Sequence, residues 1–358
     1  MQHKASPLHG PKLSVATFPE RPDCWEKNAL GTFLFSAASL EQKKPLPSAI
    51  PCMRVAMQGL SGEGEICEVW HGSGQPVQGR HGALHYRHDD EVLFGVIALD
   101  EREGGITAGA TDAGKTPLQL AAESAYKQIF TLLDTLGFPH PFRIWNYIAD
   151  INVHSFGLER YRQFNMGRQD AFLAHGRKVV GNVPAACALG SAHGPLTISF
   201  LAGRKAPLKI ENPRQTSAYL YPQQYGPRSP TFSRAGLAQV GDDRILFISG
   251  TASVVGHATL HPGDVVAQTR ETMTNVRAVL AETNRRISQP GFELPDLHYR
   301  VYVRRPADLE QIRAELTHCV GDTPKAIYLR ADVCRSDLLL EIEAAAVLTV
   351  ASATGRRD

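Results

Sequence analysis

The order of the expected elements is repeated once along the chain, and this repeat restricts the possible folds more than any other feature. In the first half, a β-type run at 91–100 precedes an amphipathic helix that begins after the candidate N-cap Thr116 and stops at Gly137. In the second half, a strand at 243–253 precedes a second amphipathic helix at 262–284. Each half then continues with a strand, a short helix and two more strands. The pattern therefore predicts two similar mixed sheets, each with two helices on one face and the other face left to pack against something else.

This duplication sets the predicted fold class and domain limits. We expect an α/β (α+β) fold of duplicated mixed sheets with helices on one face. A linker at about 204–216 separates the copies, which we assign to a domain at 1–205 with an N-terminal extension and a domain at 206–358. Residues 1 to about 50 are rich in Pro, Lys and Ser. We expect this segment to wrap the surface, with some strand character near "GTFLFSAA".

The composition argues against several classes of protein. The 358 residues carry a formal net charge of +2, without the clustered Lys and Arg that bind nucleic acid or a membrane surface. The first residues, "MQHKASPLHGPK", contain no apolar run, so no signal peptide is expected, and no apolar segment is long enough to span a bilayer. The six cysteines are scattered without a C-x-x-C pair, which is typical of reduced thiols in a cytoplasmic protein.

The last apolar strand carries two acids. "CRSDLLLEIEAAAV", from Cys334 to Val347, places Glu341 and Glu343 on a strand that reads as buried. Because side chains alternate along a strand, both carboxyls face the same side, roughly 6.6–6.8 Å apart. Burial raises the pKa of a carboxyl and a like charge raises it further, so an acid here could stay protonated near neutral pH. The residues alone also allow bland interpretations: a carboxylate that caps an element or lies at a subunit interface, and a cysteine that only packs.

Two other motifs suggest sites that we do not favour. "GATDAGKT" (109–116) has the spacing of a phosphate-binding loop, but Pro117 removes a backbone donor and the preceding strand ends too early, near Asp100. "HGALHYRHDD" offers four possible metal ligands, namely His81, His85, His88 and Asp89. They lie in a turn-rich polar segment, for which a solvated hairpin is the better interpretation. We therefore predict no metal site.

The second half of the chain resembles the RidA-like (YjgF) family. The resemblance is carried by "FISGTAS", the helix "VVAQTRETMTNVRAVL", the strand "YRVYVRR" and the ending "EIEAAAV". Together with the duplicated first half, "RYRQFNMGR" and "YLRADVCRSDLLLEIE", the whole chain resembles the chorismatases, which remove pyruvate from chorismate. It is most similar to the bacterial branch that forms 3-hydroxybenzoate, sometimes with 4-hydroxybenzoate. The resemblance implies a duplicated RidA-like (chorismate-mutase-like) fold with a degenerate first copy and a catalytic second copy.

The resemblance also implies roles for single residues. Glu341 matches the acid that protonates the enolpyruvyl methylene, Cys334 matches a cysteine of the hydroxybenzoate-forming members, and Gly250 matches a small position beside the substrate ring. Arginine and tyrosine residues at matching positions are expected to bind the two substrate carboxylates: Tyr161, Arg168, Tyr221, Arg304 and Arg330.

The function expected on these grounds is that of a cofactor-independent lyase. It would act on the small molecule chorismate, as a monomer or a homotrimer. Two enzymes remain as alternatives, a chorismate hydrolase that yields a dihydroxycyclohexadiene carboxylate and an imine deaminase. Cys334 argues against the hydrolase, and the doubled length argues against the deaminase. A RidA-like protein that only binds a ligand is the alternative outside enzymes.

Overall fold

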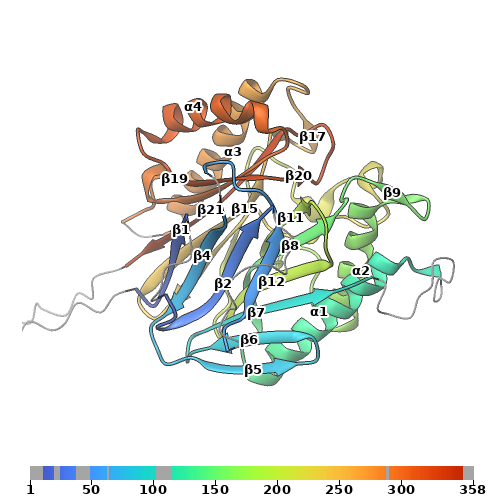
Figure 1. Ribbon diagram of the computed structural model, residues 1–358, viewed down its shortest axis with the longest axis vertical. Coiled ribbons are helices and arrows are strands. Elements are labelled where there is room, and N and C mark those ends of the chain that lie inside the picture. The colour runs from blue at the N-terminus through green and yellow to red at the C-terminus, as the bar shows by residue number, and fades with distance from the viewer. Residues whose placement is uncertain are drawn as a thin grey trace, which may run out of the picture.

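Three β-sheets form the centre of the molecule and four α-helices lie on its outside, in the residues that the computed structural model describes (11–19, 25–37, 49–62, 64–101, 114–287 and 290–349) (Figure 1). One sheet has seven strands, in the order β20-β11-β8-β12-β7-β6-β5. A second has six, in the order β13-β14-β15-β21-β18-β19, and a third has four, in the order β1-β4-β2-β3. The fold is thus a mixed α/β arrangement, as predicted.

The strands of the seven-stranded sheet are β5 (Val77–His81), β6 (Leu84–His88), β7 (Val92–Leu99), β8 (His140–Ala149), β11 (Ala185–Ser191), β12 (Leu196–Gly203) and β20 (Asp332–Val333). Those of the six-stranded sheet are β13 (Leu208–Ile210), β14 (Ala235–Val240), β15 (Asp243–Thr251), β18 (His298–Val303), β19 (Lys325–Arg330) and β21 (Leu340–Leu348). The four-stranded sheet consists of β1 (Leu13–Phe18), β2 (Ala29–Ser36), β3 (Cys52–Ala56) and β4 (Ile66–Gly72). Two small hairpins complete the list: β9 (His154–Ser155) with β10 (Leu158–Glu159), and β16 (Val254–Val255) with β17 (Ala258–Thr259).

The two larger sheets repeat one strand order, which confirms the duplication. Five neighbouring strands of the seven-stranded sheet follow the order β11-β8-β12-β7-β6. The matching five of the six-stranded sheet follow the order β19-β18-β21-β15-β14. The pair β8/β11 is parallel and so is β18/β19, while the remaining pairs in both series are antiparallel. Sheet membership changes between Gly203 and Leu208, close to our proposed domain limit at 205/206. Among the strands of the two larger sheets in the described ranges, only the short β20 departs from this division, because it pairs with β11 of the first sheet.

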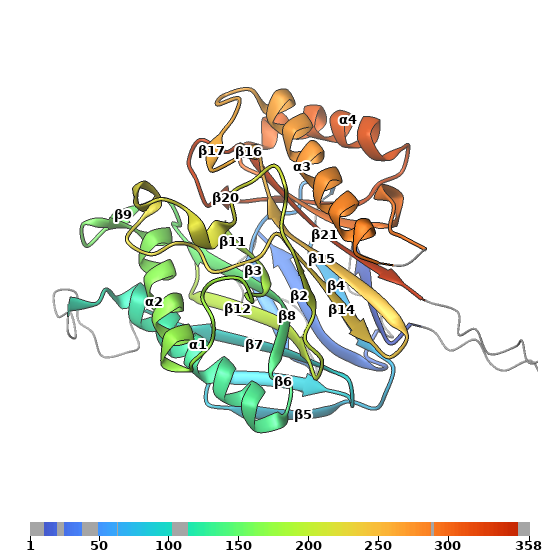
Figure 2. The same ribbon diagram turned by 180° about the vertical axis from the view of Figure 1, so that it is seen from behind.

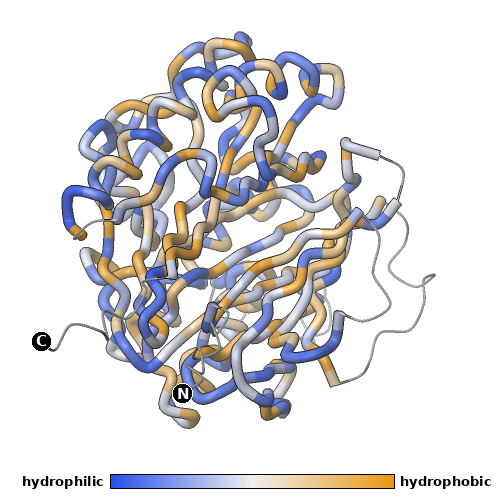
Figure 3. The backbone as a smooth tube through the Cα atoms, turned by 90° about the vertical axis from the view of Figure 1, so that its left-hand side faces the viewer, coloured by the Kyte–Doolittle hydropathy of each residue, from blue (hydrophilic) through white to orange (hydrophobic). Residues whose placement is uncertain are grey.

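Each large sheet carries a pair of helices on its outer face (Figures 1 and 2). Helices α1 (Pro117–Leu136) and α2 (Arg160–Ala174) pack on the seven-stranded sheet, and α3 (Val265–Arg285) and α4 (Leu309–Val320) pack on the six-stranded sheet. The Thr116 side chain accepts from the Gln119 amide at the start of α1, and Gly137 ends it with a φ of 71°, as the sequence predicted. In the α3 and α4 region, hydrophilic and hydrophobic stretches alternate along the chain, as expected of helices with one buried face (Figure 3).

The four-stranded sheet covers the inner faces of the larger sheets. Its strand β2 is buried along its whole length. Phe33 of β2 packs edge-on against Trp145 of β8, and Trp70 of β4 lies against Phe247 of β15. The strand predicted near "GTFLFSAA" is therefore present, but it does not wrap the surface as expected of residues 1 to about 50; residues 1–10, 20–24 and 38–48 lie outside the described residues. Its apolar side chains fill the space that the two larger sheets leave between them.

Candidate active site

A cavity of about 320 Å³ lies where the seven-stranded and six-stranded sheets meet. Strand β11 contributes Cys187 to its wall, β15 contributes Gly250 and β21 contributes Glu341. Six of the eight residues predicted from the sequence line it: Tyr161, Arg168, Tyr221, Gly250, Cys334 and Glu341.

Glu341 is the acid of this cavity. Its side chain points inward from β21, and the residue is only 4 % exposed. Burial raises the pKa of the Glu341 carboxyl to about 8, and the negative charge of Glu343 adds to the effect. The carboxyl therefore holds its proton near neutral pH, the property that the sequence led us to expect of a buried strand acid.

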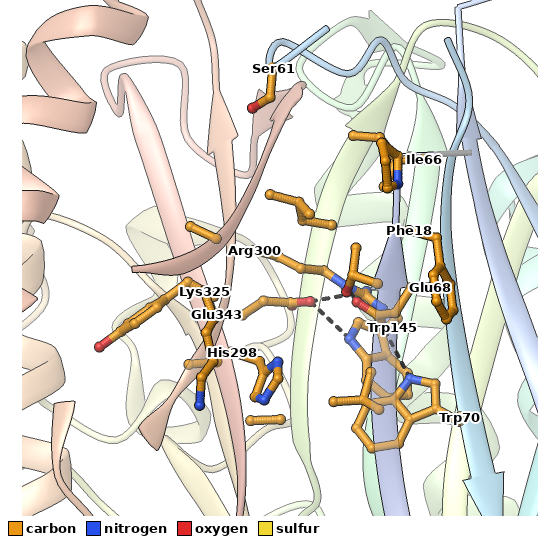
Figure 4. Close-up of a pocket in the computed structure, with 18 of the residues that line it drawn as sticks. Phe18, Ser61, Ile66, Glu68, Trp70, Trp145, His298, Arg300, Lys325 and Glu343 are labelled. Carbon is orange, nitrogen blue, oxygen red and sulfur yellow. Dashed lines mark hydrogen bonds and ion pairs between the residues drawn. The ribbon is translucent and has the colours of Figure 1, made fainter. Parts of the chain in front are cut away.

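Glu343 shares the strand face with Glu341 but has a different environment. Arg143 of β8 and Arg300 of β18 form buried ion pairs with it, and the Trp145 indole Nε1 donates to it at 2.9 Å (Figure 4). Burial alone would raise the pKa of Glu343, but the charges of the two arginines outweigh burial and hold that pKa below its usual value. The two acids therefore differ in protonation state: Glu341 is neutral and Glu343 is ionised.

Gly250 leaves room for the acid. A Cβ atom at this position would lie 1.8 Å from the nearer carboxylate oxygen of Glu341 and 3.2 Å from Cβ of Cys187. Any side chain here would collide with the catalytic candidate, so the close approach of β15 to Glu341 requires glycine.

Cys334 lies beside the acid because β20 crosses to the first sheet. Val333 pairs with Leu189 of β11, and the next residue, Cys334, then points toward Glu341. The thiol lies 3.9 Å from Oε2 of Glu341, to which it donates. Burial and the nearby Glu341 raise the pKa of Cys334 to about 12, so this residue is a neutral thiol and not a thiolate nucleophile.

Three arginines in the cavity wall have donors to spare. The Nε atoms of Arg168 and Arg234 and the Nη2 atom of Arg335 are buried and have no hydrogen-bond partner in the described protein. Arg162 is a fourth arginine of the wall, and two carboxylates besides Glu341 complete its charged groups, so the lining carries a net charge of +2 when Glu341 is neutral. A buried, unpaired guanidinium donor is costly, so this cavity suits a ligand with two negative charges.

Tyr221 is held between two of these arginines. Its hydroxyl accepts from Nη2 of Arg234 at 2.7 Å, and the Arg335 guanidinium lies 5.1 Å from the centre of its ring. Tyr161 lines the same cavity, and burial raises the pKa of its hydroxyl, which stays protonated and can donate.

The structure separates the other two predicted arginines from the cavity. Arg330 ends β19 with an exposed side chain. The Arg304 side chain donates to the backbone carbonyls of Val333, Arg335 and Leu338 and forms an ion pair with Asp332. Neither residue lines the cavity, so the expectation that they bind substrate was wrong for this geometry. Arg304 instead fixes the segment that carries Cys334 and Arg335.

Sequence reasoning missed Arg234 and Arg335, which take the places that we had assigned to Arg304 and Arg330. The predicted arginines lie at expected strand and helix positions, whereas Arg234 directly precedes β14 and Arg335 lies in a loop after β20. For Arg335, its place in the sequence directly after Cys334 was a usable signal. Nothing in the sequence around Arg234 distinguishes it from a surface charge.

The remaining motifs provide no competing site within the residues that the structure describes. Residues 109–113 of the phosphate-loop-like motif lie outside the described residues. The four possible metal ligands at 81–89 belong to the β5–β6 hairpin and its end, and no group of three or more metal-ligating side chains occurs in the part of the chain that the structure describes. None of the helices in the described ranges combines the length and apolarity that crossing a bilayer requires.

Comparison with known proteins gives consistent matches. The family described as "Chorismatase FkbO/Hyg5-like, N-terminal" matches residues 68–202. A chorismatase of Streptomyces rapamycinicus is 38% identical over 300 residues, which cover 82% of this chain and 86% of the relative. A 3-hydroxybenzoate synthase of Streptomyces hygroscopicus is 36% identical over 330 residues, which cover 88% of this chain and 91% of the relative. Among solved structures, a chorismatase matches 93% of this chain and 98% of its own, with 31% identity and a TM-score of 0.82.

Proposed function

This chain belongs to the chorismatase family, and we propose that it converts chorismate to 3-hydroxybenzoate and pyruvate. The observation that carries the proposal is the neutral, buried Glu341 in a cavity whose lining otherwise carries a net charge of +2. Chorismate is a dianion with an enol ether on a ring that is close to aromatic, so it needs both a pair of cationic contacts and a general acid that is still protonated at neutral pH.

In the first step, Glu341 transfers its proton to the terminal methylene carbon of the enol ether. Carbon accepts protons poorly, so the acid must be protonated and held against the carbon, which burial on β21 provides. Protonation gives an oxocarbenium ion. The bond between ring C3 and the ether oxygen then breaks, and its electron pair forms the ketone of pyruvate.

In the second step, the C4 hydroxyl attacks C3 and gives its proton to the Glu341 carboxylate, which forms an arene oxide and restores the acid. Opening of the C4–O bond and loss of the C3 hydrogen as a proton restore an aromatic ring and leave the oxygen on C3. Water is neither consumed nor released, so the products together contain the atoms of chorismate. Opening the other bond would give 4-hydroxybenzoate as a second product.

The arginines of the cavity hold the substrate during these steps. Arg168, Arg234 and Arg335 each offer a buried donor without a partner in the described protein, and carboxylates are the acceptors that guanidinium groups bind best. Arg168 and Arg234 are buried side chains and Arg335 is half-buried, so they lose little conformational freedom when substrate binds.

Cys334 acts in this scheme through its position. Its thiol is neutral and lies next to Glu341, so it can pack against C3 and keep water away while the C4 hydroxyl attacks. Water that reached this point would divert the reaction to the dihydroxycyclohexadiene product of a hydrolase.

The experiment is to incubate purified protein with chorismate in D2O and in H2O, to trap pyruvate as lactate, and to separate the ring products by chromatography. We expect 3-hydroxybenzoate and, in D2O, one deuterium in the pyruvate methyl group. Release of a dihydroxycyclohexadiene carboxylate would identify a hydrolase instead. If no pyruvate appears, the chain is a ligand-binding member of the fold or acts on another substrate.

Cys334→Ala is expected to change the product ratio more than the rate. Removing the thiol opens space for water beside C3, so the fraction of hydrolysis product should rise while pyruvate release falls by less than about tenfold. Chromatography of the ring products at matched pyruvate release measures this. An unchanged ratio would show that Cys334 does not keep water away from C3.

A further inference from the structure

A second cavity, of about 450 Å³, lies between the four-stranded and six-stranded sheets, apart from the candidate active site (Figure 4). Its lining comes mainly from β1 and β4 on one side and from β18, β19 and β21 on the other. The two cavities share no lining residue in the described part of the chain.

The walls of this second cavity suit a flat apolar ring. Trp70, Trp145, Phe18 and Phe247 contribute aromatic faces, and Ile327 adds an aliphatic one. Trp70 and Trp145 lie side by side with ring centres 5.9 Å apart. Because aromatic rings prefer offset or edge-to-face contacts with other rings, such a lining favours an aromatic ligand over an aliphatic one of the same size.

A buried network of charges forms its inner end. Arg300 pairs with both Glu68 and Glu343, so its charge is satisfied, and Arg143 pairs with Glu343 through Nη2. The other terminal nitrogen of Arg143, Nη1, has no partner in the described protein, although the residue is only 2 % exposed. An arginine in the cavity lining therefore has one buried donor that needs an acceptor.

A second cationic side chain, the exposed Lys325, lines the cavity on the side of β19. The ammonium group of Lys325 forms no ion pair with any described carboxylate, and it lies on β19 at the cavity lining. The neighbouring His298 is half-buried, and burial, with the charge of Lys325, lowers the pKa of its imidazole, so His298 is neutral at pH 7. The charged groups at the inner end balance one another, which leaves Lys325 as the excess charge.

We propose that this second cavity binds a single-ring aromatic carboxylate, with the ring against the tryptophans and the carboxylate at a free cationic donor. The proposal rests on the proposed function in one respect, since the hydroxybenzoate product belongs to this ligand class. The cavity would then sense product.

Glu343 links such a ligand to the active site. It lies in the second cavity, two residues from Glu341 on the same strand face, and its negative charge raises the pKa of the acid. A ligand that draws Arg143 toward its carboxylate weakens the Arg143–Glu343 pair. Occupancy should therefore lower the turnover rate without competing with chorismate for its own cavity.

Tryptophan fluorescence tests binding directly. Two of the three tryptophans line the second cavity and none lines the active-site cavity, so quenching by benzoate reports the second cavity. We expect saturable quenching by benzoate and weaker binding of the uncharged analogue benzamide. Ala345→Phe, which fills the cavity from β21, should abolish the saturable quenching, and Lys325→Glu should weaken it by about fivefold or more. Lys205→Ala, at an exposed lysine outside both cavities, is the matched control and should bind as wild type.

The outcomes separate this inference from the proposed function. Quenching that does not saturate, or that persists unchanged in both Ala345→Phe and Lys325→Glu, would overturn the second site whatever the enzyme does with chorismate. Saturable quenching with no pyruvate release would keep the site and reject the proposed function. Where pyruvate is released, benzoate should lower kcat in wild type and act only competitively in Ala345→Phe. Purely competitive inhibition in wild type would overturn the link through Glu343.

Discussion

Two acids on one strand face take opposite protonation states in this protein. The neutral thiol of Cys334 donates to Glu341, and burial keeps the proton on this acid. Glu343, two residues further, meets two arginines and an indole, which keep it ionised. The ionised acid in turn makes ionisation of the other more costly, so one arrangement both prepares the proton donor and holds the sheets together.

Keeping Glu341 neutral in the folded chain should lower the free energy of unfolding above pH 4.5, and Glu341→Gln should restore the lost stability. Below its usual pKa of 4.5 the carboxyl is neutral in both the folded and unfolded chain. As the pH rises from there to about 8, the unfolded chain ionises while the folded chain keeps its proton, so the free energy of unfolding falls, by about 3 kcal/mol at pH 7. Glu341→Gln should therefore be as stable as wild type near pH 4.5 and more stable near pH 8. Thermal unfolding across pH measures this, and a difference independent of pH would contradict it.

The properties of Glu341 were predictable because they depend on its own strand. Apolar neighbours and alternation are visible in "LLLEIEAAAV", and they predict a buried acid. The partners of Glu343 were not predictable, since Arg143 and Arg300 come from other strands and meet it only after the sheets have packed. A strand pattern shows that an acid is buried and does not show which charges it meets.

Among the secondary-structure elements, the short strand β20 and the loop after it decide the shape of the active site. β20 leaves the second half of the chain to pair with β11, and the loop that follows places Cys334 and Arg335 in the cavity. Arg304 binds three carbonyls of this segment with one guanidinium, at distances of 2.7–3.0 Å. Gln268 binds the same segment through the Asp337 carbonyl and the Leu339 amide, and Arg304 holds its first part, next to Cys334 and Arg335.

Arg304→Lys should therefore impair catalysis although Arg304 does not line the cavity. A lysine cannot reach three carbonyls with the fixed fork of a guanidinium, and a displacement of about 1 Å at Cys334 and Arg335 is expected to cost about 10- to 100-fold in kcat/KM. Pyruvate release and the ring-product ratio should both change. Arg330→Lys, at the exposed end of β19, is the control and should behave as wild type. Equal rates for the two variants would show that Arg304 does not position the loop.

Helices and repeated strands were predicted well, and the edges where sheets meet were not. Thr116 and Gly137 set the ends of α1 through local backbone chemistry, which a sequence displays. The pairing of β20 with β11 involves two residues and leaves no periodic pattern. The burial of β2 was missed for a related reason, because a third sheet that covers two others is a property of their packing.

On the scale of the whole molecule, one buried network of ion pairs connects all three sheets. Glu68 on β4 binds Arg300 on β18, Arg300 binds Glu343 on β21, and Glu343 binds Arg143 on β8. These groups lie within the shared core, where unpaired charges are expensive. The network therefore ties the correct packing of the three sheets to the charge that supports Glu341.

Glu343→Gln should lower the stability of the whole molecule. The change leaves Arg143 without a charged partner in the core and Arg300 with one in place of two, which is expected to cost about 3–5 kcal/mol in the free energy of unfolding. Glu282→Gln is the matched control, since Glu282 pairs with Arg285 and Arg286 on an exposed face of α3 and its loss should cost less than about 1 kcal/mol. Denaturant unfolding of both variants measures the difference. Equal stability of the two would mean that the network does not hold the sheets.

Whether Glu341 is the general acid is decided by the rate of pyruvate release from chorismate by wild type and by Glu341→Gln, followed across the pH range around 8. We expect the wild-type rate to fall as the pH rises through about 8, because the acid loses its proton, and the folded variant to be at least about 10²-fold slower at every pH. A Glu341→Gln protein that releases pyruvate at the wild-type rate would exclude Glu341 as the proton donor.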